Sequence, residues 1–358
     1  MKRHSYPGQV LTYLVLSFVS VTTLVPFLWM LSTSLKPEGS VFSPGFIPKD
    51  TVYEATLDGK TVRVRPLTSA EHPKRAKLME DDQGGGVPAS RDATRVVDVA
   101  DIRTETRIAP RFQNYPEAWK AYPFVSFWRA YANTLVVAAL VTIGQVVTSA
   151  LAAFAFARLR FPGRDVLFFG YLATMMIPGA VTMIPTFALL KNLPLVLDSL
   201  CHTTYFSREL VVGGHVIGID SYFALIAPRC FSAYGTFMLR QFFLGIPKEL
   251  EEAATIDGCG SLGVLRHVVL PLSKPALATL AIFTFMWAWG DFLWPLIVTN
   301  SDEIKTLPLL LQSFQGQHAT RWNYLMAASA TALVPMLVVF LAGQRYFIEG
   351  IKLGAVKG

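Results

Sequence analysis

The sequence predicts an all-α, polytopic membrane protein with six transmembrane helices, and three observations lead to that prediction. Of the 358 residues, 52% are hydrophobic and only 16% are charged, which is the composition of a membrane protein. Six apolar segments are long enough to cross a bilayer, which takes about twenty residues. Basic residues gather beside several of these segments, where they orient a membrane protein.

The first apolar segment follows Lys2 and Arg3 and runs from Val10 to Leu31. It is longer than the core of a signal peptide and lacks a small-residue cleavage site. We therefore expect an uncleaved first span, within residues 1–45. The other five expected spans are Asn133–Ala157, Val166–Leu190, Tyr222–Leu244, Ala276–Val298 and Tyr324–Tyr346. Pro178-Gly179 and Pro185 predict kinks in the third span.

The positive-inside rule sets the expected orientation. Basic residues precede the first span, fill the short loop after the second and follow the sixth; they are Lys2, Arg3, Arg158, Arg160, Arg164, Arg345, Lys352 and Lys357. An even number of spans returns the chain to the side on which it started. We therefore expect both termini to be cytoplasmic.

Two polar insertions are expected on the outer face. Residues 46–112 follow the first span, and a stretch of alternating residues flanks Asp58-Gly59, which predicts a β-hairpin. The segment 95–103 predicts a further short strand. A minor insertion at 202–218 predicts another hairpin, around Gly213-Gly214. We therefore expect a small, partly β periplasmic module at 46–112, separate from a five-helix transmembrane core at 113–358.

Several function classes are excluded. The net charge of +7 is dispersed rather than gathered into one patch, which argues against nucleic-acid binding. Cys201, Cys230 and Cys259 fall in an outer loop, a span and an inner loop, so neither a disulfide framework nor a metal site is expected. Gly59-Lys60-Thr61 resembles the end of a phosphate-binding loop, but Glu54 occupies the position of its first glycine. We expect no cofactor, nucleotide site or catalytic residue on this chain.

A polar segment at 245–271 separates the fourth and fifth spans, on the expected cytoplasmic side. Its helical pattern begins near Pro247, which suits the first turn of a helix. Glu249, Glu251 and Glu252 crowd the first turns, where the helix dipole favours negative charge. Gly258 permits the left-handed conformation that ends a helix. A short amphipathic helix followed by a tight turn is therefore expected.

The spacing in this segment resembles the EAA loop of ABC importer permease subunits. That pattern is Glu-Ala-Ala, three residues, Gly, nine residues, Ile, one residue and Leu-Pro. The chain reads Glu252-Ala253-Ala254, Gly258, Val268 and Leu270-Pro271, with valine for isoleucine as the only departure. The runs RQFFLGIPKELEEAATIDG, VLPLSKPALATLAIFTF and QRYFIEGIKLGAVKG resemble the carbohydrate-uptake branch, which includes maltose and glycerol-phosphate permeases.

The resemblance implies a multi-pass permease subunit in the bacterial inner membrane. Its implied partners are a cytoplasmic ABC ATPase dimer that binds ATP and Mg, a second permease subunit and an extracytoplasmic solute-binding protein. The implied cargo is a sugar, or a related polyol or sugar phosphate. The implied role of the polar segment is to couple the permease to the ATPase, through Glu252, Ala253, Ala254, Asp257 and Gly258.

Four residues are candidates for a substrate pathway. Trp287, Asp291 and Trp294 lie in the fifth span, where aromatic faces stack on sugar rings and a carboxylate accepts hydroxyl hydrogen bonds. An acid within a membrane normally faces protein or water. The alternative is an interfacial belt, which stays open for Asp291 and Trp294 and is favoured for Trp289. Arg229, in the fourth span, either lines the pathway or extends towards the outer surface.

Two rival functions remain open. The first is an ion-driven secondary transporter, which would need paired intramembrane charges or two related halves. The second is a non-transporting membrane scaffold that binds a partner through its insertion. Neither rival accounts for the EAA-like spacing. Asn133, at the start of the second expected span, is interpreted as a helix cap rather than a ligand.

Overall fold

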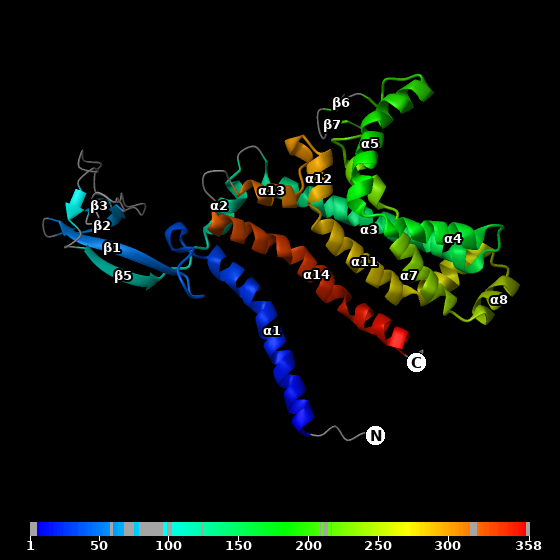
Figure 1. Cartoon of the computed structure of the whole chain (residues 1–358), viewed down its shortest axis with the longest axis horizontal. Coiled ribbons are helices and arrows are strands. Elements are labelled where there is room, and N and C mark those ends of the chain that lie inside the picture. Colours follow the sequence, from blue (N-terminus) through cyan, green and yellow to red (C-terminus); the bar gives the residue numbers. More distant parts are fainter. Residues whose placement is uncertain are drawn as a thin grey trace. The chain divides into compact units, whose positions relative to one another are not determined.

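The computed structural model describes residues 6–57, 60–67, 75–78, 96–98, 102–122, 125–207, 209–210, 214–215, 217–315 and 321–355. The chain forms two compact units. Unit 1 comprises Met1–Ala118 and Phe314–Ala330, and unit 2 comprises Trp119–Ser313 and Thr331–Gly358. Figure 1 shows the elements of both units in sequence colours.

Unit 1 begins with α1 (Tyr6–Ser34), an apolar helix whose side chains are exposed over most of its length. The end of α1 is held by polar contacts with the start of α2 (Asn114–Lys120). The Asn114 side-chain amide donates to the carbonyls of Ser34 and Lys36, at 2.7 and 2.9 Å. Lys36 is fully buried, donates to the Ser43 carbonyl at 2.9 Å and lies over the Trp29 ring. Burial lowers the pKa of the Lys36 ammonium.

The expected outer insertion contains a five-stranded antiparallel sheet with strand order β4-β3-β2-β1-β5. Its strands are β1 (Lys49–Leu57), β2 (Lys60–Leu67), β3 (Arg75–Leu78), β4 (Val96–Asp98) and β5 (Ile102–Ile108). The register pairs Leu57 with Lys60, so the predicted β1–β2 hairpin is confirmed, although its turn at Asp58-Gly59 lies outside the described residues. The short strand predicted within 95–103 is also present, as β4.

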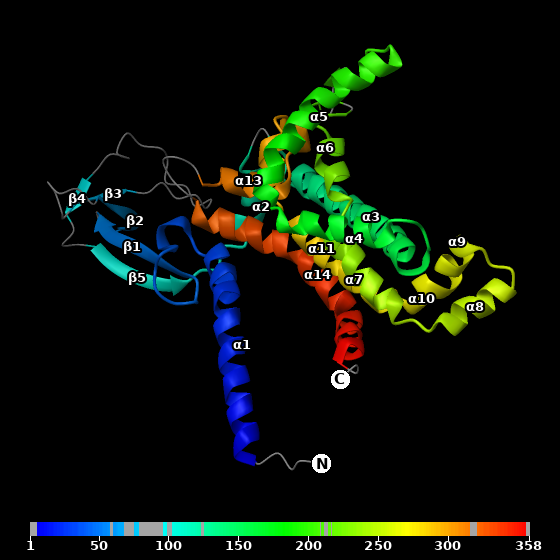
Figure 2. The same cartoon turned by 45° about the vertical axis from the view of Figure 1, so that its right-hand side comes forward.

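Unit 2 is built around three helices that pack along one another (Figures 1 and 2): α3 (Phe127–Arg158), α7 (Ala233–Leu244) and α11 (Lys274–Trp289). Small residues bring them close. Gly235 of α7 is buried where a Cβ atom would lie 2.6 Å from the Ser149 Oγ of α3 and 3.2 Å from Leu280 of α11. A continuous apolar core joins the C-terminal ends of α3 and α7 to the N-terminal end of α11, and it includes Ala150, Ala153, Phe154, Leu239, Phe243, Val264, Leu265, Val269, Ala276 and Leu280.

The remaining elements of unit 2 lie between and around these three helices in the sequence. They are α4 (Arg164–Ala173), η3 (Thr174–Met176), α5 (Gly179–Cys201), β6 (Glu209–Leu210), β7 (Gly214–His215), α6 (Tyr222–Ile226), η4 (Ala227–Arg229), α8 (Lys248–Ile256), α9 (Ser261–Val264), the π-helical η5 (Leu265–Val269), α10 (Leu270–Leu272), α12 (Leu293–Val298), η6 (Asp302–Ile304) and α13 (Leu307–Ser313). The long helix α14 (Trp322–Ala355) contributes to both units. Strands β6 and β7 pair antiparallel, which confirms the minor hairpin.

The six expected spans are not six straight helices. Among the described residues, four helices are long and apolar enough to cross a membrane: Gln9–Ser34, Phe127–Arg158, Gly179–Cys201 and Trp322–Tyr346. A fifth is obtained if Ser261–Leu272 and Lys274–Trp289, bent by 78°, count as one span. The chain is therefore a polytopic, largely helical membrane protein, with its first, second and sixth predicted spans formed by single helices.

The third, fourth and fifth predicted segments are not single helices. The break in the third lies at Pro178-Gly179, where a kink was predicted, whereas Pro185 lies inside α5. In the third, α4 and η3 end before Pro178, and α5 continues to Cys201, well past the predicted end at Leu190. The residue before a proline is pushed out of the helical conformation, and Ile177 is extended accordingly. The fourth contains η4 with Pro228, and the fifth is interrupted between α11 and α12.

The close approach at Gly235 generates a prediction. Replacing Gly235 with valine should destabilise the helix bundle by about 1–3 kcal/mol, because overpacked side chains force their neighbours to move. Gly170 of α4 is the matched control, since a Cβ atom there meets nothing within 4 Å. Gly170→Ala should leave stability unchanged or raise it. Equilibrium unfolding in mixed micelles measures both effects, and equal stability of the two variants would contradict the packing described here.

Candidate functional site

The segment 245–271, called the coupling segment below, has the predicted helix and turn. Helix α8 begins directly after Pro247, with Glu249 and Glu251 in its first turn. Gly258 has a φ of +89°, a left-handed conformation that ends α8 as predicted. A Cβ atom at Gly258 would meet nothing within 4 Å, so backbone conformation rather than space limits substitution there. Figure 2 shows α8, α9 and α10 grouped beyond the end of α7.

One side of the coupling segment is exposed and partly apolar. Glu252, Ala253, Asp257 and Gly258 lie on the surface. Two aliphatic side chains near the turn are also bare: Ile256 is 87% exposed and Leu262 is 74% exposed. Large exposed aliphatic groups on a polar segment are typical of a surface that another protein covers.

The other side of the coupling segment packs on the helix bundle. Ala254 and Cys259 are partly buried against the apolar core that joins the ends of α3, α7 and α11. Of the five predicted coupling residues, Ala254 therefore faces inwards, whereas the other four are exposed. Glu251 is also turned towards the bundle, where it pairs with Arg158 at 2.6 Å. Sequence reasoning used Arg158 only as a topological marker and did not assign it a partner.

The four predicted pathway residues meet at the breaks in the fourth and fifth spans. The Arg229 guanidinium of η4 pairs with the Asp291 carboxylate at 2.8 Å, and both side chains are mostly buried. The guanidinium lies 4.2 Å from the centroid of the Trp287 ring and 5.7 Å from that of Trp294. A cation over an aromatic face is stabilised by the ring quadrupole. The two broken spans are therefore joined by a cluster of one cation, one anion and two indoles.

The members of this cluster differ in accessibility. Trp287 is 53% exposed, whereas Trp294 is buried and its indole donates to the Ala224 carbonyl of α6 at 2.9 Å. The favoured interpretation of Trp289 as a belt residue was wrong. Its ring is buried, it donates to the Ala332 carbonyl at 3.0 Å and it stacks on Phe285.

Polar side chains of α3 satisfy the backbone at these breaks. Thr148 donates to the Cys230 carbonyl at 2.5 Å, and Gln145 donates to the Arg229 carbonyl at 3.4 Å. Gln145 also accepts a hydrogen bond from Thr284 of α11. A free carbonyl in hydrocarbon costs several kcal/mol, so a broken span needs such partners. Sequence reasoning missed both residues, although polar side chains three positions apart in an apolar helix were the signal.

Asn133 is not the helix cap that was expected. It lies inside α3 rather than before it, and its amide donates to the carbonyls of Glu303 and Lys305 at 2.8 and 3.0 Å. Its amide oxygen accepts from the Tyr222 hydroxyl at 2.7 Å. Asn133 thus ties α3 to η6 and to the start of α6, as Gln145 and Thr148 tie it to η4.

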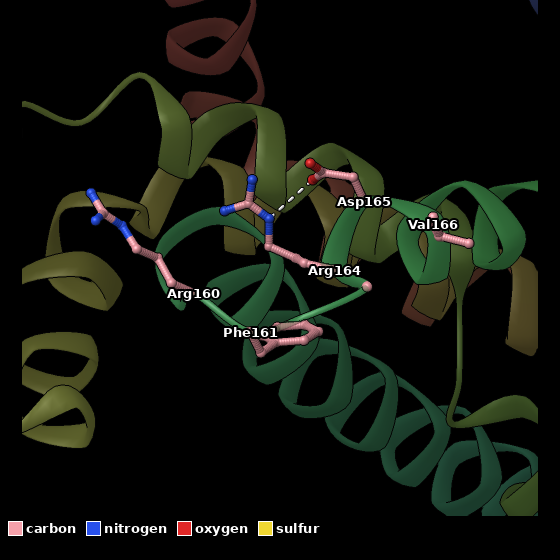
Figure 3. A pocket seen from close by; sticks show the side chains of 6 residues that line it. Arg160, Phe161, Arg164, Asp165 and Val166 are labelled. Carbon is pink, nitrogen blue, oxygen red and sulfur yellow. Dashed lines mark hydrogen bonds and ion pairs between the residues drawn. The ribbon is translucent and has the colours of Figure 1, made fainter.

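A shallow surface hollow lies at the turn from α3 to α4, lined by Arg160, Phe161, Gly163, Arg164, Asp165 and Val166. Figure 3 shows Arg164 directed at Asp165, with Arg160 extending away from them. The Arg164–Asp165 pair, at 3.0 Å, is exposed, and its hydrogen bond lowers the pKa of Asp165. Within the described residues, no group of three or more His, Cys, Asp or Glu side chains could hold a metal ion.

The Arg229–Asp291 pair generates a second prediction. Arg229→Met and Asp291→Leu should each destabilise the chain by about 3 kcal/mol, because each leaves a mostly buried charge without its partner. The loss in free energy of unfolding in the double variant should be smaller than the sum of the two single losses, by at least about 1 kcal/mol. Equilibrium unfolding of all four chains in mixed micelles completes the cycle. Additive losses would show that the two side chains are not coupled.

Comparison with known proteins agrees with this arrangement. Residues 145–353 match the family described as the inner membrane component of binding-protein-dependent transport systems. An sn-glycerol-3-phosphate transport system permease protein of Rhizobium meliloti (strain 1021) is 36% identical over 252 residues, which cover 69% of this chain and 80% of that protein. An arabinooligosaccharides transport system permease protein of Bacillus subtilis (strain 168) is 33% identical over 247 residues, covering 69% and 79%.

A solved structure has the same fold along nearly the whole chain. It is a bacterial ABC transporter involved in the import of the acidic polysaccharide alginate, with a TM-score of 0.62 and 19% identity, covering 97% of this chain and 99% of that chain. The family match spans more than half of the chain. Among the described residues, four long apolar helices have mostly exposed side chains, as the helices of a membrane protein do. The chain therefore belongs to the inner membrane components of binding-protein-dependent transport systems, as a multi-pass, non-enzymatic permease subunit of an ABC importer in the bacterial inner membrane.

Proposed function

We propose that this permease imports a sugar, or a related polyol or sugar phosphate, using ATP hydrolysed by a separate subunit. Its partners are a cytoplasmic ABC ATPase dimer, which holds ATP and Mg, a second permease subunit and an extracytoplasmic binding protein. The proposal rests mainly on one observation: Ala253, Ile256, Gly258 and Leu262 of the coupling segment are all exposed. Small residues permit close approach, and bare aliphatic groups favour burial against a partner.

The proposed topology has six spans, three of them broken. Helices α4 and α5 form the third span, α6, η4 and α7 form the fourth, and α11 and α12 form the fifth. Both termini and the coupling segment then lie in the cytoplasm, and the β-sheet of 46–112 and the hairpin of 202–218 lie outside. Interrupted helices in transporters are tolerated where they line a cavity, so the breaks at Arg229 and Asp291 are the proposed substrate pathway.

The chemistry of the pathway cluster favours a hydroxyl-rich cargo without a large net charge. Arg229 and Asp291 neutralise one another, so the cluster offers hydrogen-bonding groups rather than an excess of one charge. Trp287 keeps about half of its surface open for stacking on a sugar ring. Trp294 is buried, and in this proposal it fixes the pathway by holding α6 rather than by touching cargo.

The proposed mechanism couples ATP to these breaks. Closure of the ATPase dimer moves the coupling segments together, and the spans turn from inward-facing to outward-facing. The binding protein then delivers its cargo at the outer face. Hydrolysis resets the spans and releases the solute into the cell.

Reconstitution tests the proposal directly. The chain is assembled in proteoliposomes with its ATPase, the sister permease and the binding protein, and uptake of labelled oligosaccharides, monosaccharides and glycerol phosphate is followed. We expect uptake of one of these solutes only when both ATP and the binding protein are present. Uptake driven by an ion gradient through this chain alone would instead identify a secondary transporter, and no uptake with full partner binding would identify a scaffold.

Gly258 provides a sharper test of the coupling surface. We expect Gly258→Asp to leave the chain in the membrane but to abolish uptake, because it places a second negative charge beside Asp257 at the end of α8, where the helix dipole disfavours it. Gly258→Asn is the matched control, since asparagine tolerates the left-handed conformation and adds no charge. Membrane content, co-purified ATPase and initial uptake rate are measured for both. Normal ATPase assembly and uptake by Gly258→Asp would contradict the proposed surface.

A further inference from the structure

A buried ion pair joins the coupling segment to the inner end of α3. The Arg158 Nε donates to the Glu251 Oε1 at 2.6 Å, and the exposed fractions of the two side chains are only 7% and 14%. Arg158 is the last residue of α3, and Glu251 lies in α8. The pair therefore bridges two elements that are 93 positions apart in sequence.

The same guanidinium also binds the end of a third element. Its Nη2 donates to the Phe243 carbonyl at 2.7 Å and to the Ile246 carbonyl at 2.9 Å. The last carbonyls of a helix have no partner within it, so a planar guanidinium that fills this role fixes the end of α7. Arg158 thus makes three short hydrogen bonds, to α7, to the residues after it and to α8.

The other packing contacts of α8 and the turn after it are made by small side chains. Ala254 of α8 packs on the core, and Cys259 packs on it directly after the turn. The turn at Gly258 is open, since a Cβ atom there would meet nothing within 4 Å. A displacement of α8 therefore reaches α3 and α7 most directly through the charged pair.

We propose that Arg158 and Glu251 are positioning residues of transport, which hold α8 rigidly to the inner ends of α3 and α7. Movement imposed on the coupling segment is then passed to α3, whose Gln145 and Thr148 hold the break in the fourth span. The pair does not touch cargo or nucleotide. This inference rests on the proposed function, because it assumes that a partner moves α8.

Three conservative variants of the pair test the inference in the fully assembled importer. The variants are Glu251→Gln, which keeps the shape of the side chain, and Glu251→Asp, which keeps its charge. Arg158→Lys keeps the positive charge but loses the planar guanidinium, whose several N–H groups reach more than one acceptor. The ratio of solute taken up to ATP hydrolysed is measured in proteoliposomes, together with the amount of assembled complex. A role in folding alone would change the amount of complex without changing this ratio.

We expect Glu251→Gln to lower the ratio by about fivefold or more, the lower end of the range for energetic coupling between sites. The ratio in Glu251→Asp should lie above that in Glu251→Gln but below that of the unsubstituted chain. The ratio in Arg158→Lys should lie between those of the two Glu251 variants. The exposed Arg164–Asp165 pair is the matched control: its side chains are 31% and 64% exposed and adjacent in sequence, and Asp165→Asn should leave the ratio unchanged.

Two outcomes would overturn the inference. One is an unchanged ratio in Glu251→Gln, and the other is a loss of uptake that only follows the loss of assembled complex. Failure of the proposed function looks different, because the unsubstituted chain would then show no ATP-dependent uptake at all.

Discussion

A helix that breaks inside a membrane leaves carbonyl groups that lipid cannot satisfy, and the described part of unit 2 depends on how α3 meets this constraint. Polar side chains along α3 bind backbone carbonyls of several neighbouring elements. Asn133 donates to a carbonyl of η6, and Arg158 donates to a carbonyl of α7. Gln145 and Thr148 donate to the carbonyls at the end of η4. The break in the fourth predicted span is therefore held by this one continuous helix.

The same arrangement connects the two proposed functional regions. The C-terminal half of α3 is bound both to the break that carries Arg229, through Gln145 and Thr148, and to the coupling segment, through Arg158 and Glu251. Work received at an exposed protein surface is thereby passed to the proposed pathway through one stiff helix rather than through flexible loops. The chain itself needs no nucleotide site in this account, because it responds to a force that another subunit supplies.

Sequence reasoning captured the parts that depend on local patterns. The Gly258 turn, the helix starting after Pro247 and the hairpins of β1–β2 and β6–β7 follow from residue spacing and backbone preference. The residues Pro178-Gly179 marked the break in the third predicted segment. The breaks in the fourth and fifth were not predicted, because apolar composition measures length in the membrane and does not register a helix break. The roles of Asn133 and Arg158 depend on distant partners, at Lys305 and Glu251, and no local pattern contains such pairs.

The central claim is that α8 and α3 move as one body, and a single distance measurement tests it. Spin labels replace the exposed Leu151 of α3 and Glu249 of α8, in a background without Cys201, Cys230 and Cys259. Their separation is measured in the assembled importer with and without bound ATP. The account predicts that it changes by no more than about 2 Å, the scale of small helix shifts within a packed body. A change of more than about 5 Å, the rise of one helical turn, would contradict it.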